Sequence, residues 1–262
     1  MKFLIIGDPH GTEKVFEMPI EEADAIIIPG DLGKADLMRD LHFNDFDYVK
    51  GDWKGPTPKE KIMRAEMEAF ESTIKILDFL NKHNHVFIVF GNVESTDTVT
   101  AEKNRKYGLK LPYLEKEISR MKNIHILNNK QETFNGVKIA GNMFFVDMLW
   151  SKTFASKEKI NFERAKKQEP IAREFFSKLQ YVDILITHQP PHGYLDFVNN
   201  KRAPPSWNGK HAGSELILNY IKKFKPKYNI CGHIHEGKGT VKIGNTTVIN
   251  AGHYGDYQFI EL

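Results

Sequence analysis

The feature that most limits the fold of this chain is a series of short apolar runs rich in Ile, Val and Phe. They cover residues 3–6, 25–28, 86–90, 184–186 and 229–231. Runs this short, bounded by Gly, Pro, Asp or Asn, are typical of buried strands rather than helices. Longer segments with helical apolar spacing lie between several of them, at 59–83, 113–121, 162–179 and 214–224. Strands that alternate with helices in this way indicate an α/β fold.

Two stretches interrupt the alternation. Residues 131–146 and 239–262 have the pattern of β-hairpins, with turns at Asn135-Gly136 and Gly244-Asn245. We therefore expect two sheets, at least one of them not purely parallel. No repeat or linker divides the chain, so residues 1–262 are interpreted as one domain. The polar, turn-rich stretches, 40–58, 94–112 and 196–213, are expected to be excursions that rim or cover a site.

Composition places the chain among ordinary globular proteins, because 40% of its 262 residues are hydrophobic and 27% are charged. The formal net charge of +3 does not provide the basic face of an extended nucleic-acid binder. The single cysteine, Cys231, excludes an internal disulfide framework and is interpreted as a small buried residue. The apolar run at the N-terminus is too short for a signal peptide, and no run is long enough to span a membrane. We expect a cytoplasmic protein. The abundance of Lys, Ile and Asn suggests a prokaryotic origin. A homodimer is expected because it is the commonest oligomer of soluble proteins.

Polar residues able to bind metal follow each of the five predicted strands. They are Asp8 and His10, Asp31 after Gly30, Asn92 after Gly91, His188, and the pair His233 and His235 after Gly232. In open α/β sheets the carboxyl ends of the strands form the usual ligand crevice. Imidazoles and carboxylates together favour Mn, Fe, Co, Ni or Zn over Ca or Mg. The glycines allow the close backbone bends that bring such ligands together.

Each of these residues also has an ordinary structural explanation. Asp8 could be a turn aspartate and Asn92 a helix cap. His188 and His233 could be buried histidines with hydrogen-bond partners. Separate structural roles, however, give no reason for all five strand ends to carry ligands. The joint pattern therefore favours a metal site.

Taken in order, the motifs D-x-H, G-D, G-N, H and G-H-x-H resemble those of the calcineurin-like metallophosphoesterase superfamily, and they extend over most of the chain. The resemblance implies an α/β fold with two mixed β-sheets in a sandwich flanked by helices. It also implies a dinuclear metal centre at one edge. The expected activity is that of a phosphoesterase in which a metal-bound hydroxide attacks phosphorus.

Carried over by position, the resemblance assigns the seven ligands to two ions. It places Asp8, His10 and His235 on the first ion. It places Asn92, His188 and His233 on the second, with Asp31 bridging both. Manganese is the first choice among the divalent transition metals, with Fe, Ni, Co and Zn as alternatives. Asp31, Asn92 and His188 are also expected to act in catalysis.

The sequence departs from the superfamily at one position. The third motif usually reads Gly-Asn-His, whereas here Val93 follows Asn92. Valine cannot deliver a proton to a leaving group, and such assistance is typically worth about 10² to 10⁴ in rate. We therefore expect small phosphodiesters or nucleotides as substrates, and His253 is a candidate to supply the proton. His192 and His211 are interpreted as solvated loop residues.

Substrate contacts are expected from Asn92 and from the loop that follows His188. Lys201, Arg202 and Trp207 could line the substrate rim, although packing explains the tryptophan more readily. Two further classes of function are considered. One is a low-activity metal-binding scaffold that binds a partner, which the valine at position 93 would favour. The other is a nuclease. Retention of all seven ligands opposes the scaffold, and the near-neutral charge opposes a large nucleic-acid footprint.

Overall fold

Two mixed β-sheets form the centre of the computed structural model, which describes residues 1–153, 155, 157–200 and 207–262. The first sheet has the order β15-β1-β2-β5-β6, and only the β1–β15 pair is antiparallel. Its strands are β1 (Lys2–Ile6), β2 (Ala25–Ile28), β5 (Val86–Ile88), β6 (Ile124–Ile126) and β15 (Tyr257–Glu261). The second has the order β13-β14-β12-β9-β8-β7, with antiparallel pairs at both edges. Its strands are β7 (Lys130–Phe134), β8 (Val137–Asn142), β9 (Ile184–Thr187), β12 (Tyr228–Cys231), β13 (Gly239–Ile243) and β14 (Thr246–Asn250).

Alternation along the buried strands produces the layers. In β1, Phe3 and Ile5 point into the core between the sheets, while Leu4 and Ile6 point to the opposite face. The core between the sheets also takes Ile184 from the second sheet. Because all of these side chains are buried, the two sheets pack face to face and each needs a further layer outside it.

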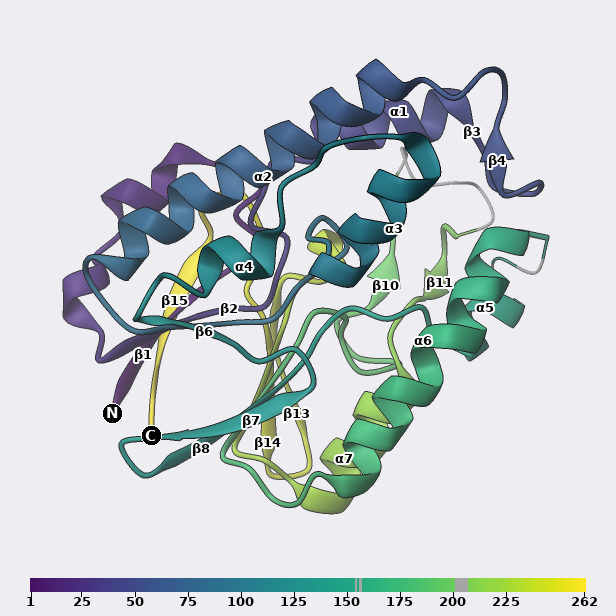
Figure 1. Cartoon of the computed structure of the whole chain (residues 1–262). Helices are drawn as coiled ribbons and strands as arrows, with labels where there is room; N and C mark the ends of the chain where they lie inside the picture. The colour runs from purple at the N-terminus through teal and green to yellow at the C-terminus, as the bar shows by residue number, and fades with distance from the viewer. Residues whose placement is uncertain (154, 156, 201–206) are drawn as a thin grey trace.

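Helices provide these outer layers (Figure 1). Against the first sheet lie α2 (Lys59–Asn81) and α4 (Leu114–Ile118), and against the second lie α6 (Lys159–Lys178) and α7 (Glu215–Phe224). The smaller elements are η1 (Glu13–Glu17), η2 (Ile20–Glu22), α5 (Met148–Thr153) and η3 (His235–Gly237). The result is a helix–sheet–sheet–helix arrangement, which confirms the predicted α/β fold with two mixed sheets flanked by helices.

The three polar excursions contain secondary structure that the sequence pattern did not predict. The first overlaps α1 (Asp36–Asp45) and includes the hairpin β3 (Phe46–Asp47) and β4 (Asp52–Trp53). The second includes α3 (Asp97–Tyr107), and the third the hairpin β10 (Phe197–Val198) and β11 (Lys210–His211). Only Thr100 of α3 is buried, so this helix lacks the apolar stripe from which a helix is predicted. Its ends are instead set by the Thr96 cap and by left-handed Gly108.

Both hairpin turns were predicted correctly. Asn135 and Gly136 have φ values of 47° and 85°, and Gly244 has a φ of 59°. Such left-handed conformations fit the twist of a two-residue hairpin. In the described part of the chain, no helix is long and apolar enough to cross a membrane.

Candidate metal centre

The candidate ligands lie where their strands end, on backbone that turns sharply. His10, Asp31 and His233 have φ values of 45°, 48° and 66°. Non-glycine residues rarely adopt this left-handed region, and such strain is concentrated at functional sites. These turns, on three separate segments, aim ligand side chains toward one another at the carboxyl edge of the sheets.

Two glycines allow the ligands to approach this closely. A Cβ atom on Gly91 would lie 2.6 Å from the backbone nitrogen of Asp31 and 2.7 Å from Cε1 of His188. A Cβ on Gly232 would lie 2.7 Å from Cγ of Asp8. Any side chain at these two positions would displace a candidate ligand, so glycine is required by space.

One group of candidate ligands consists of Asp8, His10 and His235, with ligand atoms within 4.8 Å of one another. The Nε2 atoms of the two histidines are 3.2 Å apart, and Nε2 of His235 lies 3.4 Å from Oδ2 of Asp8. Two imidazole nitrogens and a carboxylate oxygen facing a common point form a donor set suited to a transition-metal ion.

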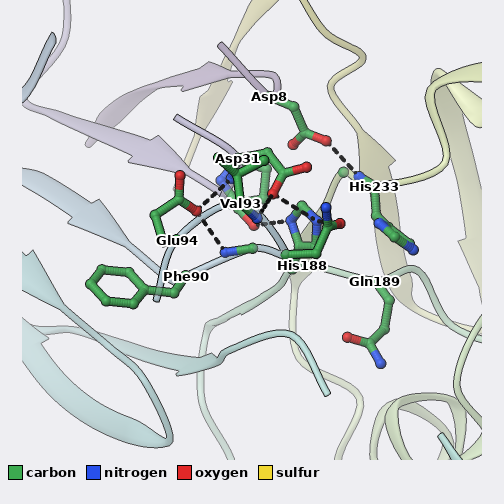
Figure 2. Close-up of polar contacts among 12 residues, drawn as sticks. Asp8, Asp31, Phe90, Val93, Glu94, His188, Gln189 and His233 are labelled. Atoms are coloured by element: carbon green, nitrogen blue, oxygen red, sulfur yellow. Dashed lines mark hydrogen bonds and ion pairs between the residues drawn. The ribbon is translucent and has the colours of Figure 1, made fainter. Parts of the chain in front are cut away.

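A second group shares Asp8 and adds Asp31 and His188, again within 4.8 Å. The carboxylate of Asp31 lies between the two groups, because Oδ1 is 3.5 Å from Nε2 of His188 and Oδ2 is 3.8 Å from Nε2 of His10. Figure 2 shows Asp8, Asp31 and His188 gathered at this point. Asp31 therefore has one oxygen directed at each group.

Asn92 and His233 lie next to His188 of the second group. Oδ1 of Asn92 is 3.2 Å from Nε2 of His188, and the rings of His188 and His233 are 5.0 Å apart. His188 Nδ1 lies 2.9 Å from the carbonyl oxygen of Pro29. Since that oxygen can only accept, Nδ1 carries the proton and Nε2 is free to act as a ligand.

The protonation states of the candidate ligands suit the binding of cations. Burial lowers the pKa of His10 to about 4 and that of His233 to about 3, so both rings are neutral at pH 7. Burial raises the pKa of Asp8 to about 7. Burial also acts to raise the pKa of Asp31, but the interaction with His188 and neighbouring imidazoles brings it below its usual range. Among the described residues, buried Oδ1 of Asp8 has no hydrogen-bond partner. A bound ion would satisfy this orphaned oxygen, so the residues present fit a metal.

Glu94 lies beside the candidate centre, and the sequence analysis did not identify it as a site residue. Its carboxylate is buried and accepts hydrogen bonds from the backbone nitrogens of Asp31, Leu32 and Gly91 at 3.0, 2.8 and 2.9 Å. Figure 2 shows it beside Asp31, on the side away from His188. Glu94 thus holds together the two turns that carry Asp31 and Asn92. Its place two residues after Asn92 was the available signal.

Three other histidines lie near this edge. The ring of His253 stacks on His235, with centroids 4.2 Å apart and planes 10° apart, and its backbone bridges to Asp8. His211 Nδ1 lies 2.6 Å from Oδ1 of buried Asp196, so it is anchored and not simply solvated. His192 Nδ1 lies 3.8 Å from the other oxygen of the same carboxylate. His253 is the one in direct contact with a candidate ligand.

The predicted substrate rim is only partly described. Lys201 and Arg202 lie outside the described residues. Trp207 contacts Trp150 edge-on, with ring centroids 5.1 Å apart. This contact supports the packing interpretation of Trp207.

Comparison with known proteins gives a consistent result. A family model described as calcineurin-like phosphoesterase matches residues 1–237. Metallophosphoesterase domain-containing protein 1 of Homo sapiens is 27% identical over 253 residues, 95% of this chain and 65% of that protein. A UPF0046 protein of Caenorhabditis elegans is 28% identical over 172 residues, 64% of this chain and 56% of that protein. The chain thus spans about two thirds or less of the length of these relatives.

A solved structure supports the fold. It covers 99% of this chain and 94% of its own, with a TM-score of 0.60 at 19% sequence identity. At this identity the similarity concerns the architecture alone, which is the sandwich of two mixed sheets described above.

Proposed function

The chain belongs to the calcineurin-like phosphoesterase family, and from that premise we propose that it is a metal-dependent phosphoric ester hydrolase that acts on small phosphodiesters or nucleotides. The observation that carries the proposal is the position of Asp31. Its Oδ2 lies 3.8 Å from Nε2 of His10 and its Oδ1 lies 3.5 Å from Nε2 of His188, so the carboxylate stands between a candidate ligand of each ion. A bridging carboxylate is what a pair of divalent ions about 3.5 to 4 Å apart requires.

In this proposal Asp8, His10 and His235 hold one ion, and Asn92, His188 and His233 hold the other. Asp31 contributes to both. When bound, such ions supply Lewis-acid charge and an activated water for attack on phosphorus. Manganese is the proposed ion. Fe, Ni, Co and Zn are alternatives because they also bind imidazole and carboxylate ligands.

The residues of the chain prepare this centre in three ways. Glu94 fixes the turn that carries Asp31. Pro29 sets the tautomer of His188. Burial keeps the imidazoles of His10 and His233 neutral at pH 7, so that neither has to lose a proton to bind a cation.

The preference for diesters rests on Val93. Its side chain is buried and cannot donate a proton to a leaving group. Diesters with good leaving groups need less proton delivery than esters of poor ones. His253, stacked on His235, is proposed as the nearby group that handles a proton, and Asn92, Lys201, Arg202 and Trp207 are proposed as substrate contacts.

The cellular setting is proposed from the sequence. A cytoplasmic location and a homodimer are predictions. The prokaryotic origin rests on composition alone, whereas the relatives named above are animal proteins.

The test is a paired assay of metal-stripped protein, reloaded with Mn²⁺, on bis-p-nitrophenyl phosphate and p-nitrophenyl phosphate. We expect turnover that needs the metal, is faster on the diester, and falls at least about 10²-fold in Asp31→Asn. Asp40→Asn, a change at an exposed aspartate, is the matched control and should behave as wild type. Protein that binds two ions and hydrolyses neither ester would exclude the proposal and favour the scaffold.

A further inference from the structure

Four aromatic rings form a closed circle at the first group of candidate ligands. His10 and His235, two of those ligands, have ring centroids 5.1 Å apart. His253 stacks on His235 with centroids 4.2 Å apart. Tyr254 closes the circle, because its ring centroid lies 4.9 Å from that of His253 and 5.2 Å from that of His10. These contacts place the Tyr254 ring directly against a candidate ligand of the first ion.

The circle has a buried half and an exposed half. The two candidate ligands form the buried half, since only 2% of the His10 side chain and 23% of the His235 side chain are exposed. The exposed half is the outer pair, His253 and Tyr254. His253 is half-buried, and 38% of Tyr254 is exposed. An accessible aromatic surface therefore adjoins the buried ligands of the first ion.

The turn that carries the outer pair is tied to the segment that carries Asp8. The backbone nitrogen of Tyr254 donates to the carbonyl oxygen of Asp8 at 3.1 Å, and the backbone nitrogen of Gly7 donates to the carbonyl oxygen of Asp256 at 3.0 Å. Within the turn, the Asp256 carboxylate accepts from the backbone nitrogen of His253 at 3.0 Å. The outer pair is thus held in place beside the candidate ligand Asp8 by bonds of the backbone on both sides of Tyr254.

The backbone of Tyr254 indicates a role beyond packing. Its φ of 50° lies in the left-handed region, and two other positions of the same turn, with φ values of 81° and 96°, are the glycines Gly252 and Gly255. Glycine adopts this region freely, whereas a bulky residue rarely does. Strain of this kind is concentrated at functional sites. A large ring that is strained, exposed and in contact with a candidate ligand is placed to contact a bound molecule.

We propose that Tyr254, with His253 beside it, is a substrate-binding residue whose ring stacks on the base of a nucleotide bound with its phosphate at the first ion. Every nucleobase has a π-face, and stacking on an aromatic side chain typically strengthens binding by about 5- to 150-fold per base. The inference rests on the proposed function, which supplies the bound phosphate ester. It narrows the substrate class of that site to nucleotides, including diesters that contain a nucleoside.

The test compares AMP with ribose 5-phosphate, which carries the same phosphate without the base, on the full chain loaded with Mn²⁺. Calorimetry measures both dissociation constants, and metal content is determined on the same samples. We expect wild type to bind AMP about 5- to 150-fold more tightly than ribose 5-phosphate. Tyr254→Leu removes the ring and should lower this ratio at least about 5-fold. Tyr254→Phe keeps the ring and should preserve the ratio. Metal content should not change in either variant.

The control is Tyr181→Leu. Tyr181 is 41% exposed and precedes β9, whereas His188 follows the same strand, so this tyrosine lies at the opposite edge of the sheet. The variant should bind both ligands as wild type does.

Three results would overturn the proposal. The first is a wild type that binds AMP no more tightly than ribose 5-phosphate, or that binds neither. The second is a ratio that Tyr254→Leu leaves unchanged, or that Tyr254→Phe lowers as much as Tyr254→Leu, which would assign the contact to the hydroxyl. The third is loss of metal from Tyr254→Leu with both ligands weakened alike, because the ring would then only hold His10 in place.

Failure of this inference and failure of the proposed function can be told apart. If wild type hydrolyses the aryl diester and Tyr254→Leu keeps the wild-type binding ratio, the hydrolase proposal stands and the role of Tyr254 falls. If the preference for AMP depends on the Tyr254 ring but no ester is hydrolysed with any metal, the nucleotide site stands and the hydrolase proposal falls.

Discussion

Asp8 is the residue whose chemistry depends most on whether an ion is bound. It is fully buried, Oδ2 accepts from the backbone nitrogen of His233 at 2.7 Å, and no described residue bonds to Oδ1. Burial raises its pKa to about 7. Without metal, therefore, the carboxyl is mostly protonated below pH 7, although a metal ligand must be ionised.

This residue predicts how metal binding depends on pH. At pH 6 binding should release close to one proton, because Asp8 must ionise. At pH 8 it should release almost none, because Asp8 is already ionised. His10 and His233, with pKa values of about 4 and 3, are neutral at both pH values and contribute no proton. Metal affinity should consequently fall as the pH drops below about 7.

Calorimetric titration of Mn²⁺ in two buffers of different ionisation enthalpy, at pH 6 and at pH 8, measures the protons released. Asp8→Asn removes the titrating group, so its release at pH 6 should vanish together with much of the affinity. Release of two or more protons at pH 6 would show that the histidines are charged in the metal-free protein, contrary to this account.

At the scale of elements, the start of α1 and the strand end that carries Asn92 form one packed unit. Val93 packs against Ala35 before α1 and Ala69 in α2. A cavity of only about 30 Å³ adjoins it, lined in part by Phe70 and Glu94. The contacts of Val93 in this cluster are with two alanine side chains, so a branched apolar residue fits better there than a polar one.

Val93→His is accordingly expected to destabilise the protein by about 1 to 3 kcal/mol, the cost of burying a polar group without a matched partner. Urea unfolding of the metal-free protein measures the loss. The matched control is Val99→His on α3, where 38% of the residue is exposed, and it should lie within about 0.5 kcal/mol of wild type. An equally stable Val93→His would mean that α1 can move aside and that its docking is not fixed by this contact.

The position of each site residue relative to the strands explains whether the sequence could predict it. The residues after β1, β2, β5, β9 and β12 were found because apolar runs mark strands and polar residues stop them. Glu94 was missed because its contacts join segments far apart in sequence. Its carboxylate accepts from backbone nitrogens, and no pattern of side chains in the sequence reveals such contacts.

At the scale of the whole molecule, the two ends of the chain complete the same sheet. β15 pairs with β1 from Lys2 with Glu261 to Ile6 with Tyr257, and Figure 1 shows the termini close together. The backbone nitrogen of Met1 donates to the carbonyl oxygen of Leu262 at 2.7 Å. The candidate ligands are likewise divided between the sheets, since Asp8 and Asp31 follow strands of the first, and His188 and His233 follow strands of the second. Neither sheet can build the centre alone.

We therefore predict that residues 1–262 unfold as one cooperative unit. Far-UV circular dichroism and tryptophan fluorescence should give coincident transitions for the metal-free protein, as expected for a two-state domain. An ion that bridges both sheets binds the folded state only, so a concentration of Mn²⁺ about 100 times the dissociation constant should add about 2.7 kcal/mol and raise Tm by about 5 to 10 °C. The shift should disappear in Asp31→Asn, because Asp31 faces both ligand groups. Two separate transitions, with the metal acting on one of them, would show instead that the sheets are independent units and that the core between them is too weak to couple them.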